Sequence, residues 1–210
     1  LSIGARRNAG KQKFYWRITQ FLLPFYTMIP PVGQFEHSGD QPYNGHAWVP
    51  IDNYNTWTWS FGVHPHQDYD ETTYKFFAGD NGMWGPIDEN SIPLRNKTND
   101  YLIDRNIQKK KSFTGIDGIP NQDAAVQESM GPIVDRSKEH LGTSDSAIIA
   151  FRKLLLRLAK NLRGGKIPAA ASHGDWYNVR SASVLLDQNV DWQDGSAHLV
   201  SGRVGKSAAD

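Results

Sequence analysis

Two closely spaced histidines are the first residues in this sequence that could do chemistry. His64 and His66 are followed by Asp68 and Asp70. Alternate residues of an extended strand point to one side, so the two histidines can bind one metal ion while a carboxylate completes the ligand set. Pro65 disfavours a strand at this point, however, and histidine-rich turns also occur on protein surfaces. Both interpretations stay open, and we favour the surface turn.

A predicted helix over residues 122–130 carries a second candidate. Asn121 is the expected N-cap, and Asp123 lies in the first turn on the same side as Gln127. A carboxylate there can be a lone metal ligand, or it can simply stabilise the helix dipole, and the spacing alone favours the dipole. Glu128 lies about 140° round the helix from Asp123. We therefore expect Glu128 to pair elsewhere and not to form a carboxylate dyad with Asp123.

Composition excludes several classes of protein. With 39% hydrophobic and 21% charged residues, the chain can fold around a core. Its 23 Lys and Arg nearly balance 22 Asp and Glu, so no broad positive surface for nucleic acid is expected. No apolar run is long enough for a membrane span. The absence of cysteine excludes disulfides, thiol catalysis and a Cys-ligated iron–sulfur cluster in these residues, and it fits the cytoplasmic location that we expect.

The elements that must position these groups begin with β-structure. Alternating side chains predict strands over 14–19, 46–49 and 56–61, with a loop over 24–31 and turns at 44–45 and 53–55. Large side chains share one face of the third strand: Trp57, Trp59 and Phe61. On the first strand, one face carries Phe14, Trp16 and Ile18. These two faces are candidate pocket walls or ordinary core.

A long amphipathic helix is predicted over 144–163. Thr143 and Ser144 are the candidate N-caps, and two glycines end the helix. Its apolar residues recur at helical spacing, so one side of the helix should pack on the sheet. Residues 79–120 are loop-rich, and after residue 169 no pattern clearly indicates a helix or a strand. We expect one domain over residues 1–210.

Several stretches together resemble the catalytic domain of Rieske non-haem iron oxygenases. They read GIPNQDAAVQESMGPI at 118–133, DRSKEHLG at 135–142, WRITQFLLP at 16–24 and WVPIDN at 48–53. The closest group contains phthalate 4,5-dioxygenase and related aromatic-acid oxygenases and O-demethylases. The resemblance covers most of residues 3–190. It implies an α+β fold of the helix-grip type, similar to Bet v 1 and START domains, in which a long C-terminal helix packs on a twisted antiparallel sheet.

The resemblance also implies an activity in aromatic compound catabolism. In that family a Rieske domain binds a [2Fe–2S] cluster, and the catalytic domain holds Fe(II) on two histidines and one carboxylate. By match to the helix motif, Asp123 is the carboxylate ligand. A reductase passes electrons from NADH, and the oxidoreductase uses O₂ to hydroxylate or O-demethylate an aromatic substrate. Relatives form trimers, so a homotrimer is one candidate assembly, but the sequence does not settle the oligomeric state of a truncated chain. For an aromatic acid, Arg17 is the candidate carboxylate contact, and Trp57, Trp59 and Phe61 are candidate pocket walls.

The sequence departs from the family pattern in one important respect. Only 122 residues precede Asp123, and none of them form the family's iron-ligating histidine motif. We therefore expect the C-terminal part of an oxygenase subunit, without its Rieske domain, which alone binds no cofactor and is inactive. One alternative is a non-catalytic module that binds an apolar ligand on the same scaffold. Another is a metal-binding or interaction protein that uses His64, His66 and a nearby Asp.

Overall fold

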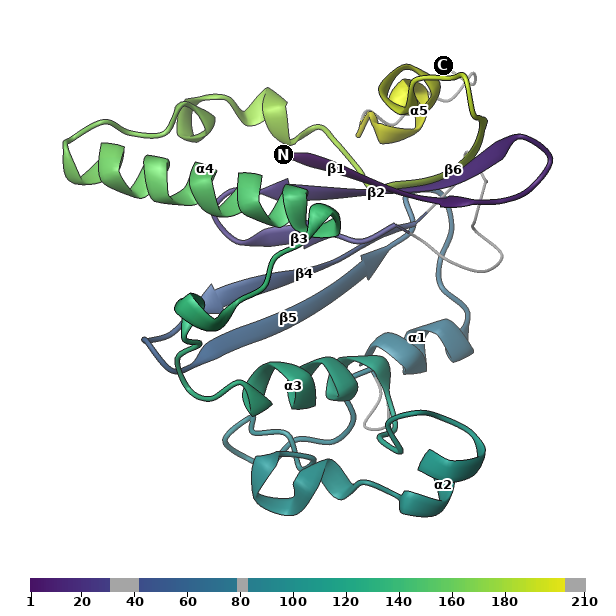
Figure 1. Cartoon of the computed structure of the whole chain (residues 1–210), viewed down its shortest axis with the longest axis vertical. Coiled ribbons are helices and arrows are strands. Elements are labelled where there is room, and N and C mark those ends of the chain that lie inside the picture. The colour runs from purple at the N-terminus through teal and green to yellow at the C-terminus, as the bar shows by residue number, and fades with distance from the viewer. Residues whose placement is uncertain (31–41, 79–82, 203–210) are drawn as a thin grey trace. The chain divides into compact units, whose positions relative to one another are not determined.

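A computed structural model describes residues 1–30, 42–78 and 83–202 (Figure 1). The chain divides into two compact units. The first comprises Leu1–Ile51, Thr56–His66 and Glu139–Asp210, and the second comprises Asp52–Asn55 and Gln67–Lys138. The first unit contains the sheet, and the second contains the helix that carries Asp123.

A six-stranded antiparallel sheet forms the centre of the first unit. Its strands are β1 (Ser2–Asn8), β2 (Lys13–Leu22), β3 (Tyr26–Met28), β4 (Tyr43–Pro50), β5 (Thr56–Val63) and β6 (Ala182–Asp187). The order is β1-β2-β3-β4-β5, and β6 pairs with β2. The first half of β2 pairs with β6 and its end pairs with β3, so both strands use the same edge of β2. The α+β fold expected from the sequence is confirmed.

The strand register gives the sheet two different faces, because directly paired residues point to the same side. We call one the apolar face, defined by Trp16, Ile18, Leu22, Met28 and Phe61. We call the other the arginine face, defined by Arg17, Phe21, Thr27, His46 and Ser60. Hydrogen bonds tie polar groups of the arginine face together, including 2.8 Å between His46 Nδ1 and Ser60 Oγ.

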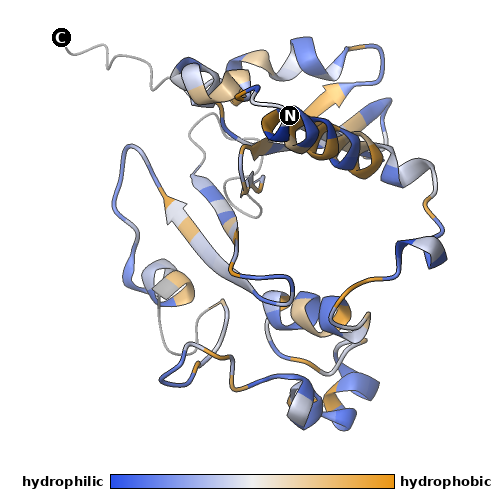
Figure 2. Ribbon diagram, turned by 90° about the vertical axis from the view of Figure 1, so that its left-hand side faces the viewer, coloured by the Kyte–Doolittle hydropathy of each residue, from blue (hydrophilic) through white to orange (hydrophobic). Residues whose placement is uncertain are grey.

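Helices pack against residues of both faces. Phe151 of α4 (Ser146–Arg163) meets Phe21 edge-on, with ring centroids 4.4 Å apart. Trp192 of α5 (Trp192–Val200) stacks on Trp16 at 5.8 Å. Helix α4 is the long helix on the sheet that the sequence predicts. Figure 2 shows the alternation of apolar and polar residues along it. No helix in the described part of the chain is both long and apolar enough to cross a membrane.

The predicted strands over 14–19, 46–49 and 56–61 are confirmed. The turn predicted at 44–45 is wrong, because both residues lie inside β4. Gly45 is needed there for close approach, since a Cβ would lie 2.2 Å from the Thr27 carbonyl oxygen and 2.6 Å from the Phe61 ring. The loop expected over 24–31 contains β3. The turn at 53–55 is confirmed, where Asp52 accepts two backbone hydrogen bonds of 2.7 Å that lower the pKa of its carboxyl.

The second unit consists of loops and short helices, and the sequence predicts only the loops and the helix that carries Asp123. It contains α1 (Glu71–Ala78), the 3₁₀ segment η2 (Lys97–Leu102), α2 (Arg105–Lys110) and α3 (Ile119–Ser129). Helix α3 starts three residues before its predicted start at 122, since a proline is tolerated in the first helical turn. Asn121 is therefore not the N-cap. Its buried side chain instead donates to the Asp117 carbonyl at 2.9 Å.

Candidate functional site

Asp123 lies on α3 with its side chain exposed. The start of this helix is tightly fixed. Gly118, the N-cap, has a φ of 81°, and a Cβ there would lie 2.9 Å from the Asn121 amide. The Asn121 side chain closes the same turn through Asp117. The turn that presents Asp123 is thus held by groups that are not themselves candidates for chemistry.

Glu128, on the same helix, has a different partner. The Tyr101 hydroxyl donates to Glu128 Oε2 at 2.5 Å. Tyr101 is buried, and burial, the hydrogen bond and the carboxylate charge together raise the pKa of its hydroxyl. Tyr101 lies in a run of three left-handed residues, 100–102, with φ values of 50°, 55° and 51°. Such a run costs roughly 1 kcal/mol or more per residue, so the bond to Glu128 helps to hold a strained segment. The expectation that Glu128 pairs elsewhere is confirmed.

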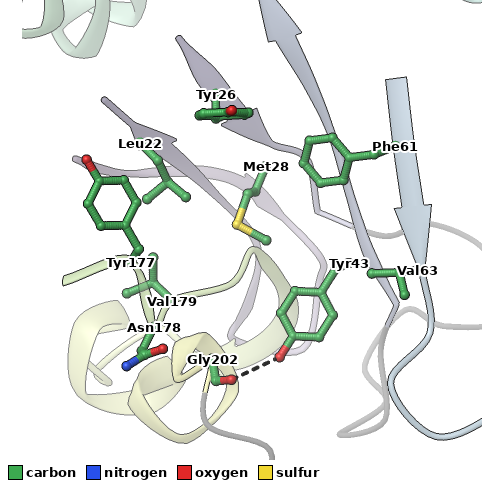
Figure 3. Close-up of a pocket in the computed structure, with 10 residues that line it drawn as sticks. All are labelled: Leu22, Tyr26, Met28, Tyr43, Phe61, Val63, Tyr177, Asn178, Val179 and Gly202. Carbon is green, nitrogen blue, oxygen red and sulfur yellow. Dashed lines mark hydrogen bonds between the residues drawn. The ribbon is translucent and has the colours of Figure 1, made fainter. Parts of the chain in front are cut away.

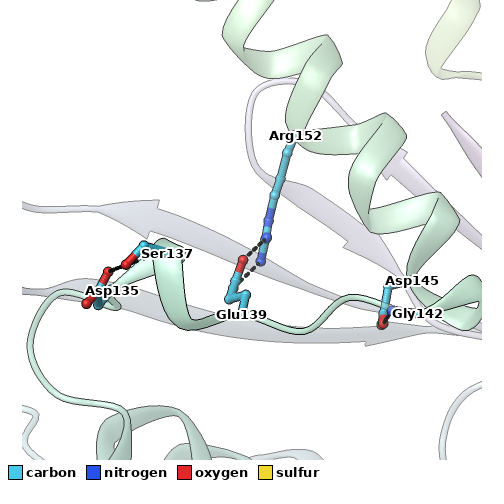
Figure 4. Close-up of polar contacts among 6 residues, drawn as sticks. All are labelled: Asp135, Ser137, Glu139, Gly142, Asp145 and Arg152. Carbon is cyan, nitrogen blue, oxygen red and sulfur yellow. Dashed lines mark hydrogen bonds and ion pairs between the residues drawn. The ribbon is translucent and has the colours of Figure 1, made fainter.

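Side chains of the DRSKEHLG stretch after α3 form hydrogen bonds that stabilise the local structure (Figure 4). Asp135 accepts hydrogen bonds from the backbone and hydroxyl of Ser137, which lower the pKa of its carboxyl. Arg152 of α4 donates two hydrogen bonds to Glu139, at 2.6 and 3.1 Å. These contacts give Asp135, Ser137 and Glu139 a structural role and do not require a catalytic one.

The same stretch leads into α4 through a 3₁₀ turn, η4 (Thr143–Asp145). Asp145 Oδ2 accepts the Gly142 backbone N–H at 2.8 Å. Asp145 is the N-cap of α4, so the prediction of Thr143 or Ser144 is wrong. The extra 3₁₀ turn moves the cap one or two residues further along the chain.

Arg17 lies half-buried on the arginine face. Its guanidinium donates to the Pro30 carbonyl at 3.0 Å and to the Tyr15 hydroxyl at 3.5 Å. Both acceptors are neutral, so these two bonds orient the guanidinium without neutralising its charge. Such a group can bind a carboxylate in a bidentate manner.

The aromatic candidates lie on the other face of the sheet. Trp57 and Trp59 stack on each other at 5.7 Å, and they are 41% and 58% exposed. Phe61 follows them and lines a cavity. Arg17 and these three aromatics therefore cannot line a single pocket. The second aromatic set, Phe14, Trp16 and Ile18, contains two buried residues, and its Trp16 packs under α5.

The cavity beside Phe61 has a volume of about 450 Å³ and lies on the apolar face (Figure 3). Sheet residues form one part of it, and residues just before β6 and just after α5 form the rest: Leu22, Tyr26, Met28, Tyr43, Phe61 and Val63, with Tyr177, Asn178, Val179 and Gly202. The Tyr43 hydroxyl donates to the Gly202 carbonyl at 3.3 Å. Sequence reasoning missed this cavity, since its two sides come from segments more than 100 residues apart that carry no shared motif.

His64 and His66 lie just beyond the end of β5 and not in a strand. His64 is buried, and its Nδ1 accepts the His66 backbone N–H at 3.3 Å. The two rings are 6.3 Å apart at 70°. In the described part of the chain, no three His, Asp or Glu side chains gather closely enough to hold a metal ion.

Comparison with known proteins decides the family. The family model described as "LigXa C-terminal domain like" matches residues 5–208. The chain belongs to this family. It is 34% identical over 200 residues to the phthalate 4,5-dioxygenase oxygenase subunit of Pseudomonas putida. This alignment covers 92% of this chain and 43% of that protein. It is 32% identical over 221 residues to the 3-chlorobenzoate-3,4-dioxygenase oxygenase subunit of Comamonas testosteroni, covering 95% and 48%.

These relatives confirm the resemblance to aromatic-ring oxygenases of the phthalate dioxygenase type. The chain spans about half the length of the curated relatives that it matches. The iron and the iron–sulfur cluster of such enzymes do not fit this chain by itself. Asp123 is exposed without a described cluster of ligands around it, and the sequence has no cysteine.

Proposed function

We propose that this chain is the C-terminal part of the catalytic domain of a Rieske-type oxygenase subunit. The intact subunit would hydroxylate or O-demethylate an aromatic acid, with O₂ and with electrons that a reductase takes from NADH in the cytoplasm. The observation that carries the proposal is the match of nearly the whole chain to two oxygenase subunits whose names both specify aromatic acids. The Rieske domain and the two iron-binding histidines would belong to a part of the subunit outside this chain.

Within the proposal, two residues of this chain have defined tasks. Asp123 would supply the carboxylate ligand of the iron, presented by the fixed first turns of α3. Arg17 would bind the carboxylate of the substrate, because its guanidinium is oriented by neutral acceptors on the arginine face. Trp57 and Trp59 lie on the opposite face of the sheet, so in this arrangement they are not part of the substrate pocket.

The chain by itself should be inactive. One carboxylate does not hold Fe(II) against water with useful affinity, because a stable site needs several convergent ligands. The electron path would also be absent, since no residue here can bind the cluster through a thiolate. The intact subunit would form a homotrimer.

The test begins with the DNA upstream of the codon for Leu1. The expected reading frame continues upstream and encodes a Cys/His cluster motif and an Asp/His iron motif. The complete frame would then be expressed with a reductase, and oxygenated product from phthalate or 3-chlorobenzoate would be measured. Asp123→Asn should abolish product formation. The matched control is Asp194→Asn, because Asp194 is likewise an exposed carboxylate within the first five residues of a helix. Full activity of Asp123→Asn would refute the assignment.

A further inference from the structure

We infer that the cavity on the apolar face is a binding site for an uncharged aromatic molecule with one ring. It is separate from the proposed substrate site at Arg17, and it does not rest on the proposed function. The two sites face away from each other, since Arg17 and the residues of the cavity floor belong to opposite sides of the same sheet. All the residues that line it lie in the first unit.

The size and lining of the cavity suit a small apolar ligand. Its volume of about 450 Å³ falls in the range of ligand sites, and a cavity of about 150 Å³ already accommodates benzene. Met28, Phe61 and Val179 present hydrocarbon, sulfur and ring surface to the space (Figure 3). No Asp, Glu, Lys, Arg or His is among the described lining residues. A carboxylate would find no ion-pair partner among the residues that line the cavity, whereas an uncharged ring gains apolar contacts there, so we expect the uncharged ring to bind more tightly.

One polar group at the cavity is placed to accept a hydrogen bond. The Tyr43 hydroxyl donates its proton to the Gly202 carbonyl, whereas the Tyr177 hydroxyl points away from the cavity and donates to the Leu23 carbonyl at 3.1 Å (Figure 3). A tyrosine oxygen that has committed its proton still has lone pairs to accept a further hydrogen bond. The Arg180 guanidinium lies 4.4 Å above the Tyr43 ring and helps to fix it. The cavity therefore favours a ring that carries a donor, such as a phenol.

Methionine methyl groups provide a direct assay. The chain has three methionines, Met28, Met83 and Met130, and only Met28 lines the cavity. The protein would be labelled with methyl-¹³C methionine and titrated with p-cresol and, separately, with p-toluate, which carries a carboxylate in place of the hydroxyl. We expect p-cresol to shift the Met28 signal with a Kd of about 1 mM, which is typical of so small a ligand. The Kd for p-toluate should be at least about tenfold higher.

Variants keep the assay decisive. Val179→Phe should fill the cavity and abolish the Met28 shift, whereas Val126→Phe, on exposed α3 surface, should leave it unchanged. Met83 and Met130 lie in the second unit, so the urea-unfolding midpoint of each variant, followed by far-UV circular dichroism, is measured to show that the first unit is still folded. Tyr43→Phe is a second variant without added bulk, and it should raise the Kd for p-cresol about threefold or more while sparing toluene.

Three results would overturn the inference. The first is an equal response to p-toluate and p-cresol. The second is a shift of all three methionine signals, which would indicate non-specific binding. The third is a Met28 shift that depends on protein concentration without ligand, which would show that a second copy of the chain occupies the cavity.

Discussion

The paired hydrogen bonds between Glu139 and Arg152 should contribute measurably to the stability of the first unit. The two side chains are 21% and 33% exposed, and their contacts are 2.6 and 3.1 Å. Charge-assisted, two-point contacts of this kind exceed exposed ion pairs, which contribute about 0.2–1 kcal/mol. Arg152→Gln or Glu139→Gln should therefore lower the free energy of unfolding by roughly 1.5 kcal/mol, or the Tm by about 4 °C.

A double-mutant cycle measured by urea unfolding isolates the pair. The coupling between Glu139 and Arg152 should be about 1 kcal/mol and should persist in 0.5 M salt. The matched control is Lys13 and Asp187, which lie opposite each other on β2 and β6 at 3.7 Å and are 42% and 61% exposed. Their coupling should be about 0.3 kcal/mol and should vanish in salt. Equal couplings for the two pairs would refute the reasoning from burial and geometry.

Three further predictions concern stability, pH and metal. Gly45→Val should lower the free energy of unfolding by about 3 kcal/mol or more, because its side chain would collide with the Thr27 carbonyl, whereas Gly174→Ala, in open space, should change it by less than about 0.5 kcal/mol in urea unfolding. The folded state raises the pKa of Tyr101, so the unfolded chain loses that proton first and stability should fall as pH rises above about 10; urea unfolding from pH 8 to 11 should show a smaller fall for Tyr101→Phe. After anaerobic dialysis with Fe(II), elemental analysis should find far less than one iron per chain, and Asp123→Asn should not change it; one retained equivalent would contradict the ligand count.

Much of the sheet could be predicted from local patterns. The alternation in β2 and β5 identified both strands, and the spacing of apolar residues identified α4. No comparable pattern indicates β6 or α5. Ser181 and Ser183 are almost completely buried at β6, so small polar residues occupy positions where a pattern of large apolar side chains would be expected. Gly195 allows α5 to pack closely on β6, since a Cβ at this position would lie 2.7 Å from the Leu186 side chain.

The candidate site shows the same division between local and long-range information. The helix motif identified Asp123, and alternation within β2 correctly placed Arg17 on the side opposite Trp16. Alternation within single strands could not show that Trp57 and Arg17 lie on opposite faces, because that depends on the register across four strands. The cavity depends further on the return of the C-terminal segment to the sheet.

The pairing of β2 with β6 also constrains the order in which the chain can fold. Lys13 lies opposite Asp187, and this ladder joins residues 164 to 174 positions apart. Ile18 and Ala182 pair in the same ladder, and both are fully buried. Contacts of such high sequence separation form slowly, because a long loop must close before they contribute. During synthesis, one edge of β2 therefore stays only partly paired until β6 has been made. Most of the second unit, by contrast, is a continuous segment that can fold as soon as it leaves the ribosome. A chain that is cut before residue 182 would keep that edge open to aggregation.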